Sequence, residues 1–228
     1  MSDQHPDHLR TPDTICNPDG RNYHLMMLDS ETYRQRTLDD QYKEIEKLTL
    51  NASVPDGINT QFETSKNLYL YAWFVYRFYP VARHHALTVL ELALRERFDK
   101  EIGDKSKYRS RDGRVYLKSL LRYCHDNDLL IDEGFVAARR RAEINARERT
   151  LLEMIEEMDK KGLMEVALED SEVDVLDTDR EFDYVKKLTT SLPNMRNIHA
   201  HGSKMLDNHA YGVLQSVSEI INQLWPDN

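Results

Sequence analysis

Apolar residues along this chain recur mainly three and four positions apart, which is the period of an amphipathic helix. Turn residues at Val54-Pro55-Asp56-Gly57, at Pro80 and at Gly162 divide the pattern into segments. The predicted helices cover 29–50, 60–79, 81–100, 115–124, 132–161, 179–192 and 206–224. The pattern predicts no strand and shows no internal repeat. We therefore expect an all-α fold, a helical bundle of about six or seven helices.

Composition varies along the chain and suggests its organisation. Residues 1–28 are rich in proline and poor in apolar residues until their end, which indicates a loosely ordered N-terminal arm. Residues 29–228 are expected to form a single helical domain. Two segments in it stand out by charge: a basic loop at 105–114, and an acidic connector at 165–180 that reads as solvated and partly mobile.

The overall composition excludes several classes of protein. No apolar run reaches the ~18 residues that span a bilayer, and the N-terminus does not resemble a secretory signal, so we expect a cytoplasmic protein without membrane contact. The two cysteines, Cys16 and Cys124, are too far apart to suggest a disulfide framework or a thiolate zinc site. The net charge of −9 argues against a protein that coats nucleic acid through its total charge, but it leaves room for a local basic patch.

One stretch concentrates residues that can perform chemistry. It runs Leu192-Pro193-Asn194-Met195-Arg196-Asn197-Ile198-His199-Ala200-His201-Gly202. An imidazole with a pKa near neutrality can accept or donate a proton, and a guanidinium can stabilise charge on a phosphate without a metal. On one regular helix Arg196 and His201 lie about 140° apart, so cooperation between them requires a broken helix end at Gly202 or a second subunit.

Two features outside this stretch each leave two interpretations open. Glu91 falls in the middle of an apolar stripe and must find a partner: either Arg95, one helical turn away, or the 196–201 segment. The basic loop is either an RNA-binding patch or an ordinary solvated loop. The patch consists of Lys105, Lys107, Arg109, Arg111 and Arg114.

The stretch Arg196-Asn197-Ile198-His199-Ala200-His201-Gly202 resembles the signature of the HEPN superfamily, an arginine, often followed by a polar residue such as asparagine, with a histidine four to six positions further on. The resemblance implies a compact helical bundle with the motif near the last two helices. It also implies that Arg196 and His201 are catalytic and that Asn197 supports them. His199 is not required by the signature, and Glu91 matches only a loosely kept polar position. The long acidic segment and the N-terminal arm depart from the family pattern.

Many members of that superfamily are metal-independent endoribonucleases that act as homodimers, often as toxins or antiviral effectors. The resemblance therefore implies an RNA substrate, a homodimer, no cofactor and no metal, and an antitoxin or regulatory protein as a further partner. The alternative is a non-catalytic HEPN-like module that binds RNA, nucleotide or a protein partner. Two other interpretations of the motif stay open: a polar helix end, and a metal site that uses His199, His201 and His209, for which the imidazole spacing is poor.

Overall fold

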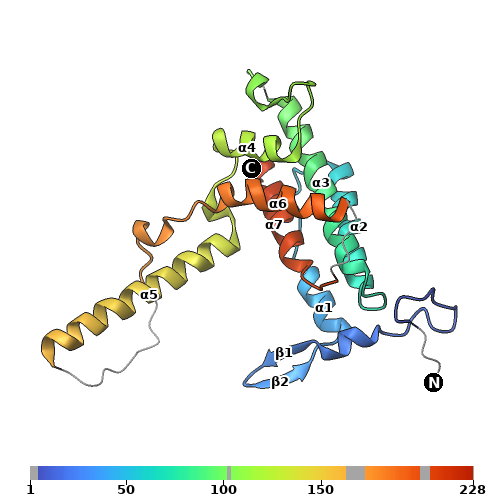
Figure 1. The fold of residues 1–228 in the computed structure, drawn as a ribbon, viewed down its shortest axis with the longest axis horizontal. Helices are drawn as coiled ribbons and strands as arrows, with labels where there is room; N and C mark the ends of the chain where they lie inside the picture. Colours follow the sequence, from blue (N-terminus) through green and yellow to red (C-terminus); the bar gives the residue numbers. More distant parts are fainter. Residues whose placement is uncertain (1–4, 102–103, 163–172, 201–205, 228) are drawn as a thin grey trace.

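The computed structural model describes residues 5–101, 104–162, 173–200 and 206–227 (Figure 1). These residues form seven α-helices, four short 3₁₀ turns and one two-stranded sheet, so the prediction of a predominantly helical fold with six or seven helices is confirmed. Within these ranges no helix is both long and apolar enough to cross a membrane. The helices are α1 (Leu38–Ile45), α2 (Asp56–Tyr71), α3 (Phe78–Lys100), α4 (Leu117–Asp126), α5 (Val136–Lys161), α6 (Tyr184–Ala200) and α7 (Tyr211–Leu224).

The centre of the fold is α3, which packs against α2, α4, α6 and α7 (Figure 1). Leu87, Leu90 and Leu94 on α3 are fully buried, as their spacing predicts. Helix α3 begins at Phe78, so Pro80 lies in its first turn. The N–H groups of the first turn have no acceptor within the helix, and a proline, which lacks an N–H, is therefore tolerated there. Since three other helices besides α2 meet α3, side chains along it can contact segments far apart in the sequence.

The N-terminal part of the chain contains a β-hairpin, so the prediction of no strand is wrong. Strands β1 (Met26–Asp29) and β2 (Thr32–Gln35) pair antiparallel, and Ser30 in the turn has a left-handed φ of 53°. Helix α1 begins at Leu38 rather than near residue 29, because Thr37 and Asp40 form a capping box. Most side chains of the hairpin are exposed, so no buried apolar face marked the strands.

Part of the predicted N-terminal arm is packed against the corner between α2 and α3. Asn22 is fully buried and donates hydrogen bonds to the carbonyl oxygens of Ala72 (3.1 Å) and Trp73 (2.8 Å). Asp19 is also buried and accepts hydrogen bonds from Arg21. The 3₁₀ turn η1 (Gly20–His24) is therefore attached to the helical body.

Helix α5 extends away from the rest of the molecule (Figure 1). It ends at Lys161, and Gly162 follows with a φ of 63°, as the sequence predicts. The acidic 3₁₀ turn η4 (Asp177–Arg180) lies along α5, where Arg149 binds Asp179 at 3.1 Å and Asn145 donates to the Asp179 carbonyl at 2.9 Å. This end of the acidic connector is folded rather than freely solvated, whereas residues 163–172 of the connector lie outside the described residues.

Candidate functional site

Helix α6 carries the motif and is fixed at its start by an acid from another segment. The backbone N–H groups of Tyr184 and Val185 donate to the two carboxylate oxygens of Asp132, at 2.8 and 2.9 Å. Asp132 lies in the 3₁₀ turn η3 (Asp132–Gly134), just before α5. Free N–H groups at a helix start bind such a carboxylate well, and this explains why α6 begins at Tyr184 rather than near Asp179.

The motif lies in the last turns of α6 and does not follow a break. Pro193 is inside the helix and buried, and the helix continues to Ala200. Leu188 and Leu192 are buried in the core on the same helix. Arg196 is therefore held on a helix whose apolar side is packed, one turn beyond Leu192.

Glu91 on α3 contacts both of the partners proposed for it. Its Oε1 lies 2.6 Å from the Arg95 guanidinium, and its Oε2 lies 3.5 Å from the Arg196 guanidinium. Arg95 also donates to the Val115 carbonyl at 2.7 Å. The two interpretations of Glu91 are thus compatible: one carboxylate joins a neighbour on its own helix to the motif arginine on α6.

A second ion pair attaches the chain to α3 after the motif. Arg83 is buried on α3 and binds Asp207 through two hydrogen bonds, at 2.9 and 3.1 Å. Burial opposes ionisation of Asp207, but the hydrogen bonds from Arg83 and from the His209 N–H outweigh it and hold the pKa of Asp207 below its ordinary value. Arg83 and Glu91 are eight positions apart, about 12 Å along α3.

The two contacts bracket the segment that contains the motif histidines. Arg196 is tied to Glu91 at one end, and Asp207 is tied to Arg83 at the other. His199 falls in the last turn of α6, where only its backbone is described, and His201 lies outside the described residues. Asn197 is described and exposed.

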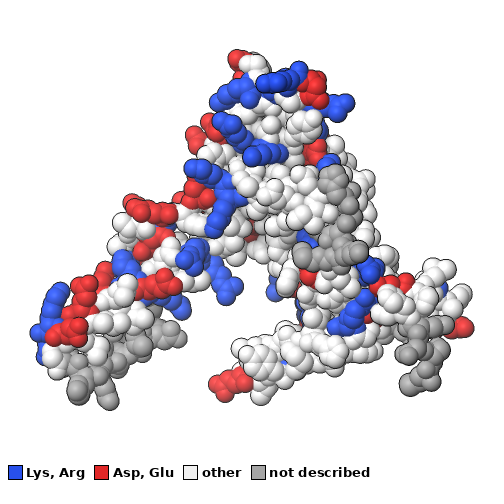
Figure 2. Space-filling model, in the orientation of Figure 1, with Lys and Arg blue, Asp and Glu red and all other residues white. Residues whose placement is uncertain are grey.

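The basic loop adjoins the same face of α3. Lys and Arg side chains gather at the end of the molecule where this loop lies (Figure 2). Arg95, Arg109 and Arg114 line one hollow there, so the loop is continuous with the Glu91–Arg95 pair. The loop includes the 3₁₀ turn η2 (Ser106–Tyr108) and a turn at Gly113 with a φ of 78°.

The five basic residues of the loop are not equally available to a ligand. The Lys105 ammonium packs on the Phe98 ring, and Lys107 lies 3.4 Å from Asp126. Arg114 is exposed and lies 3.4 Å from Asp112. Arg111 is exposed and makes no ion pair within the described ranges. Arg111 and Arg114 are accordingly the most accessible cations of the patch.

A hollow with a mixed, mainly apolar lining on the neighbouring face of α6 was not foreseen from the sequence. It has a volume of about 550 Å³, and Tyr184, Ser191 and Met195 of α6 line it together with His209 and Tyr211. On its far wall, Arg36, Glu44 and the Tyr69 hydroxyl bind one another. These residues come from distant parts of the chain, so no local pattern marks them. The sequence indicated His209 only as a candidate metal ligand.

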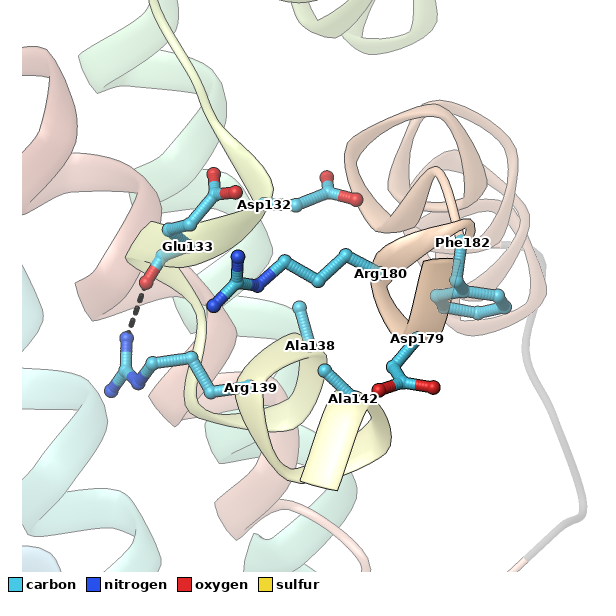
Figure 3. Close-up of a pocket in the computed structure, with 8 residues that line it drawn as sticks. All are labelled: Asp132, Glu133, Ala138, Arg139, Ala142, Asp179, Arg180 and Phe182. Atoms are coloured by element: carbon cyan, nitrogen blue, oxygen red, sulfur yellow. Dashed lines mark hydrogen bonds between the residues drawn. The ribbon is translucent and has the colours of Figure 1, made fainter. Parts of the chain in front are cut away.

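A smaller hollow lies where α5 meets the body (Figure 3). Its volume of about 130 Å³ is below the roughly 300 Å³ at which small-molecule pockets begin. Asp132 and Asp179 on its rim already bind α6 and Arg149. We therefore regard it as a structural junction.

Other reactive groups offer little for catalysis. Cys124 is buried, and burial raises its pKa to about 12, so it stays a neutral thiol at physiological pH. Among the described residues no three His, Cys, Asp or Glu side chains form a group suited to a metal ion.

Comparison with family models, curated proteins and solved structures finds no match to this chain. The functional interpretation therefore rests on the residues and their geometry.

Proposed function

We propose that this protein is a HEPN-type, metal-independent endoribonuclease in which Arg196 and His201 act on the scissile phosphate. The observation that carries the proposal is the contact of Arg196 with Glu91, together with the Arg83–Asp207 pair that anchors the chain beyond His201. Arg196 is held at the end of a packed helix, yet its side chain is 41% exposed. A guanidinium in that position can donate hydrogen bonds to a phosphate oxygen from its free side.

The reaction needs only the substrate, a pair of imidazoles and a guanidinium. An imidazole removes the proton of the ribose 2'-hydroxyl, the 2'-oxygen attacks phosphorus, and the bond to the 5'-oxygen breaks. A protonated imidazole returns a proton to that leaving oxygen, which gives a 2',3'-cyclic phosphate and a free 5'-hydroxyl. Arg196 stabilises the extra negative charge on the pentacoordinate phosphorus. Asn197, which is exposed beside Arg196, would orient the RNA or an imidazole through its amide.

Two subunits supply the pair of imidazoles most simply. On a regular helix Arg196 and His201 diverge by about 140°, so a two-fold axis that brings two motifs to one cleft would let them cooperate. Arg111 and Arg114 would then bind the flanking RNA backbone, since both are exposed and Arg114 lines the hollow that Arg95 also lines. We further propose that the enzyme acts as a toxin or phage-defence effector, held in check by an antitoxin or regulatory protein.

The test is RNA cleavage by the purified protein in EDTA. We expect single-stranded RNA to be cut with 2',3'-cyclic phosphate ends, and Arg196→Ala or His201→Ala to abolish cutting without unfolding the protein. Dependence on added metal, or unchanged cutting in both variants, would contradict the mechanism. Expression that is toxic in the parent and harmless in His201→Ala would support the effector role.

The 550 Å³ hollow favours a second candidate function, a non-catalytic module that binds a nucleotide. Its size fits a small ligand, and the Tyr211 ring with nearby Ser191 and His209 offers stacking and hydrogen bonding. This function predicts mononucleotide binding that Tyr211→Ala removes and Arg196→Ala leaves intact, with no RNA cleavage. Calorimetry with a panel of mononucleotides would separate the two candidates.

A further inference from the structure

A hollow of about 310 Å³ lies between the last turns of α3, the basic loop and the start of α4. This volume falls within the range of small-ligand pockets. Arg95, Arg109 and Arg114 line the hollow, and Asp99 is the one acid among the described residues of its lining. The hollow is therefore suited to a ligand that carries negative charge.

Two of these arginines keep donors free for such a ligand. Arg109 uses its Nη1 to donate to the Gly113 carbonyl at 3.1 Å, and its other guanidinium nitrogens make no hydrogen bond within the described ranges. The Nε of Arg114 lies 3.4 Å from Asp112, but the side chain is 76% exposed, and its two terminal nitrogens have no partner in the part of the chain that the structure describes. Both arginines can therefore donate to a phosphate oxygen.

The third arginine fixes the wall of the hollow. Arg95 donates to the Val115 carbonyl at 2.7 Å and pairs with Glu91, so it attaches the residue after the basic loop to α3. Glu91 also contacts Arg196, and one turn of α3, about 6 Å, separates Glu91 from Arg95. A ligand in the hollow would thus lie near the phosphate that Arg196 is proposed to bind.

Tyr116 presents an exposed aromatic ring at this hollow. Its backbone is extended, with φ −99° and ψ 160°, and neighbouring side chains of an extended chain lie on opposite sides. Val115 and Leu117 are buried, so the Tyr116 ring lies on the outside, where it is 52% exposed. Phe98, which also lines the hollow, is buried and packs edge-to-face on Tyr123. The Tyr116 ring is therefore the one available for stacking on a ligand.

We propose that the hollow binds one unpaired nucleotide of the RNA substrate, with its base stacked on Tyr116 and its phosphate held by Arg109 and Arg114. This assignment rests on the RNA substrate of the proposed function, and Tyr116 would position the strand beside Arg196. Stacking on a tyrosine accepts any base but requires that the base be unpaired. The subsite therefore selects single-stranded over double-stranded RNA.

The test is fluorescence anisotropy of a short single-stranded RNA in EDTA, with His201→Ala as the parent so that the RNA stays intact. Tyr116→Ala should weaken binding about fivefold or more, the equivalent of about 1 kcal/mol, because the base loses its stacking partner. The slope of log affinity against log salt should not change, since no charge is removed, whereas Arg114→Ala should lower it by about 0.7. Tyr116→Phe keeps the ring and should bind like the parent.

An RNA backbone of the same length without bases tests stacking directly. The parent should bind the intact RNA about fivefold or more tightly than the abasic strand, and Tyr116→Ala should lose most of this preference. Tyr42→Ala is the matched control, because Tyr42 is similarly exposed (48%) on α1, far from the loop (Figure 1), and it should leave binding unchanged. Circular dichroism should show that every variant keeps its helix content.

Weakening by Tyr116→Ala no greater than that by Tyr42→Ala, or an unchanged preference for intact RNA, overturns the subsite, and so does a parent that does not bind single-stranded RNA. Cleavage of the same RNA by protein that retains His201 tests the nuclease separately. Equal cleavage at subsaturating concentration with and without Tyr116→Ala contradicts the subsite alone. RNA that is bound through Tyr116 but never cut contradicts the nuclease alone.

Discussion

Glu91 of α3 binds Arg95 at 2.6 Å with one carboxylate oxygen and lies 3.5 Å from Arg196 of α6 with the other. The carboxylate thus holds the motif arginine at the surface of the bundle while sharing its charge with a second arginine. Its side chain is only 18% exposed, so the pairing is partly shielded from water. A phosphate that approaches Arg196 would meet a guanidinium already oriented but not fully neutralised.

Glu91→Gln should separate the structural role of this carboxylate from its role at the motif. Both arginine partners of Glu91 are more than 40% exposed, and ion pairs with such solvated partners contribute little, so we expect a change in unfolding free energy of no more than about 1 kcal/mol. RNA cleavage should fall about tenfold or more, because Arg196 loses its orienting charge. Arg95→Ala is the control: it leaves the Glu91–Arg196 contact in place and should retain most of the activity. Equal losses of RNA cleavage in Glu91→Gln and Arg95→Ala would show that the Glu91 carboxylate has no separate role in orienting Arg196.

Asp132→Ala should destabilise the start of α6. The carboxylate accepts two backbone hydrogen bonds there, and loss of such a cap costs about 1 to 2 kcal/mol. Chemical denaturation would measure the difference. Glu133→Ala, one residue further on and with no side-chain hydrogen bond in the described part of the chain, should change stability by less than about 0.5 kcal/mol.

The Arg83–Asp207 pair should make stability depend on acid pH. The pKa of Asp207 is lower in the folded protein than its ordinary value of 3.8, so ionised Asp207 stabilises the fold above that value. This contribution is lost as the pH falls through the lower, folded-state pKa. Asp207→Asn should therefore be less stable than the wild type at pH 7, with a difference that shrinks as the pH falls below about 4.

Denaturant unfolding at several pH values would measure this difference. Asp207→Asn should cost about 3 kcal/mol at pH 7, because it leaves the buried Arg83 without a counter-charge. The double variant Arg83→Met/Asp207→Asn should recover part of the loss. A constant difference from pH 7 to about pH 2 would contradict the role assigned to ionised Asp207.

Arg111→Ala/Arg114→Ala should weaken RNA binding and reduce its salt dependence. Each lost phosphate contact lowers the slope of log affinity against log salt by about 0.7 for single-stranded RNA. Fluorescence anisotropy in a His201→Ala background would measure binding without cleavage. Lys160→Ala, on α5 and paired with Glu156, is a control that should leave the slope unchanged. An unchanged slope in the double variant would favour the solvated-loop interpretation.

Periodicity in the sequence predicted the helical core because burial follows it directly. Leu87, Leu90 and Leu94 are buried as their spacing requires, and Gly162 ends α5 in the left-handed conformation that glycine favours. Periodicity failed for the hairpin, because neither strand buries a regular apolar face. Helix α7 begins at Tyr211 rather than near Leu206, since Asp207 is held by Arg83.

The contacts of the candidate site were only partly accessible from the sequence. The spacing of Arg95 from Glu91 indicated one partner, but the approach of Arg196 depends on how α6 crosses α3, which local sequence does not encode. Asp132 at the start of α6 and Asp207 opposite Arg83 are likewise tertiary contacts. Such pairs form only when the helices pack together. A sequence motif can therefore indicate chemistry without revealing which residues from other segments hold the motif side chains in place.

The measurement that tests the central proposal most directly is the single-turnover cleavage rate of RNA in EDTA for the wild type, Arg196→Lys and Arg196→Ala. A lysine keeps the charge but not the planar, two-pronged guanidinium, so we predict wild-type cleavage to cyclic phosphate ends, about tenfold or greater loss in Arg196→Lys, and none detectable in Arg196→Ala. Thermal unfolding should be unchanged in both variants. Cleavage at the wild-type rate in folded Arg196→Ala would contradict the proposal.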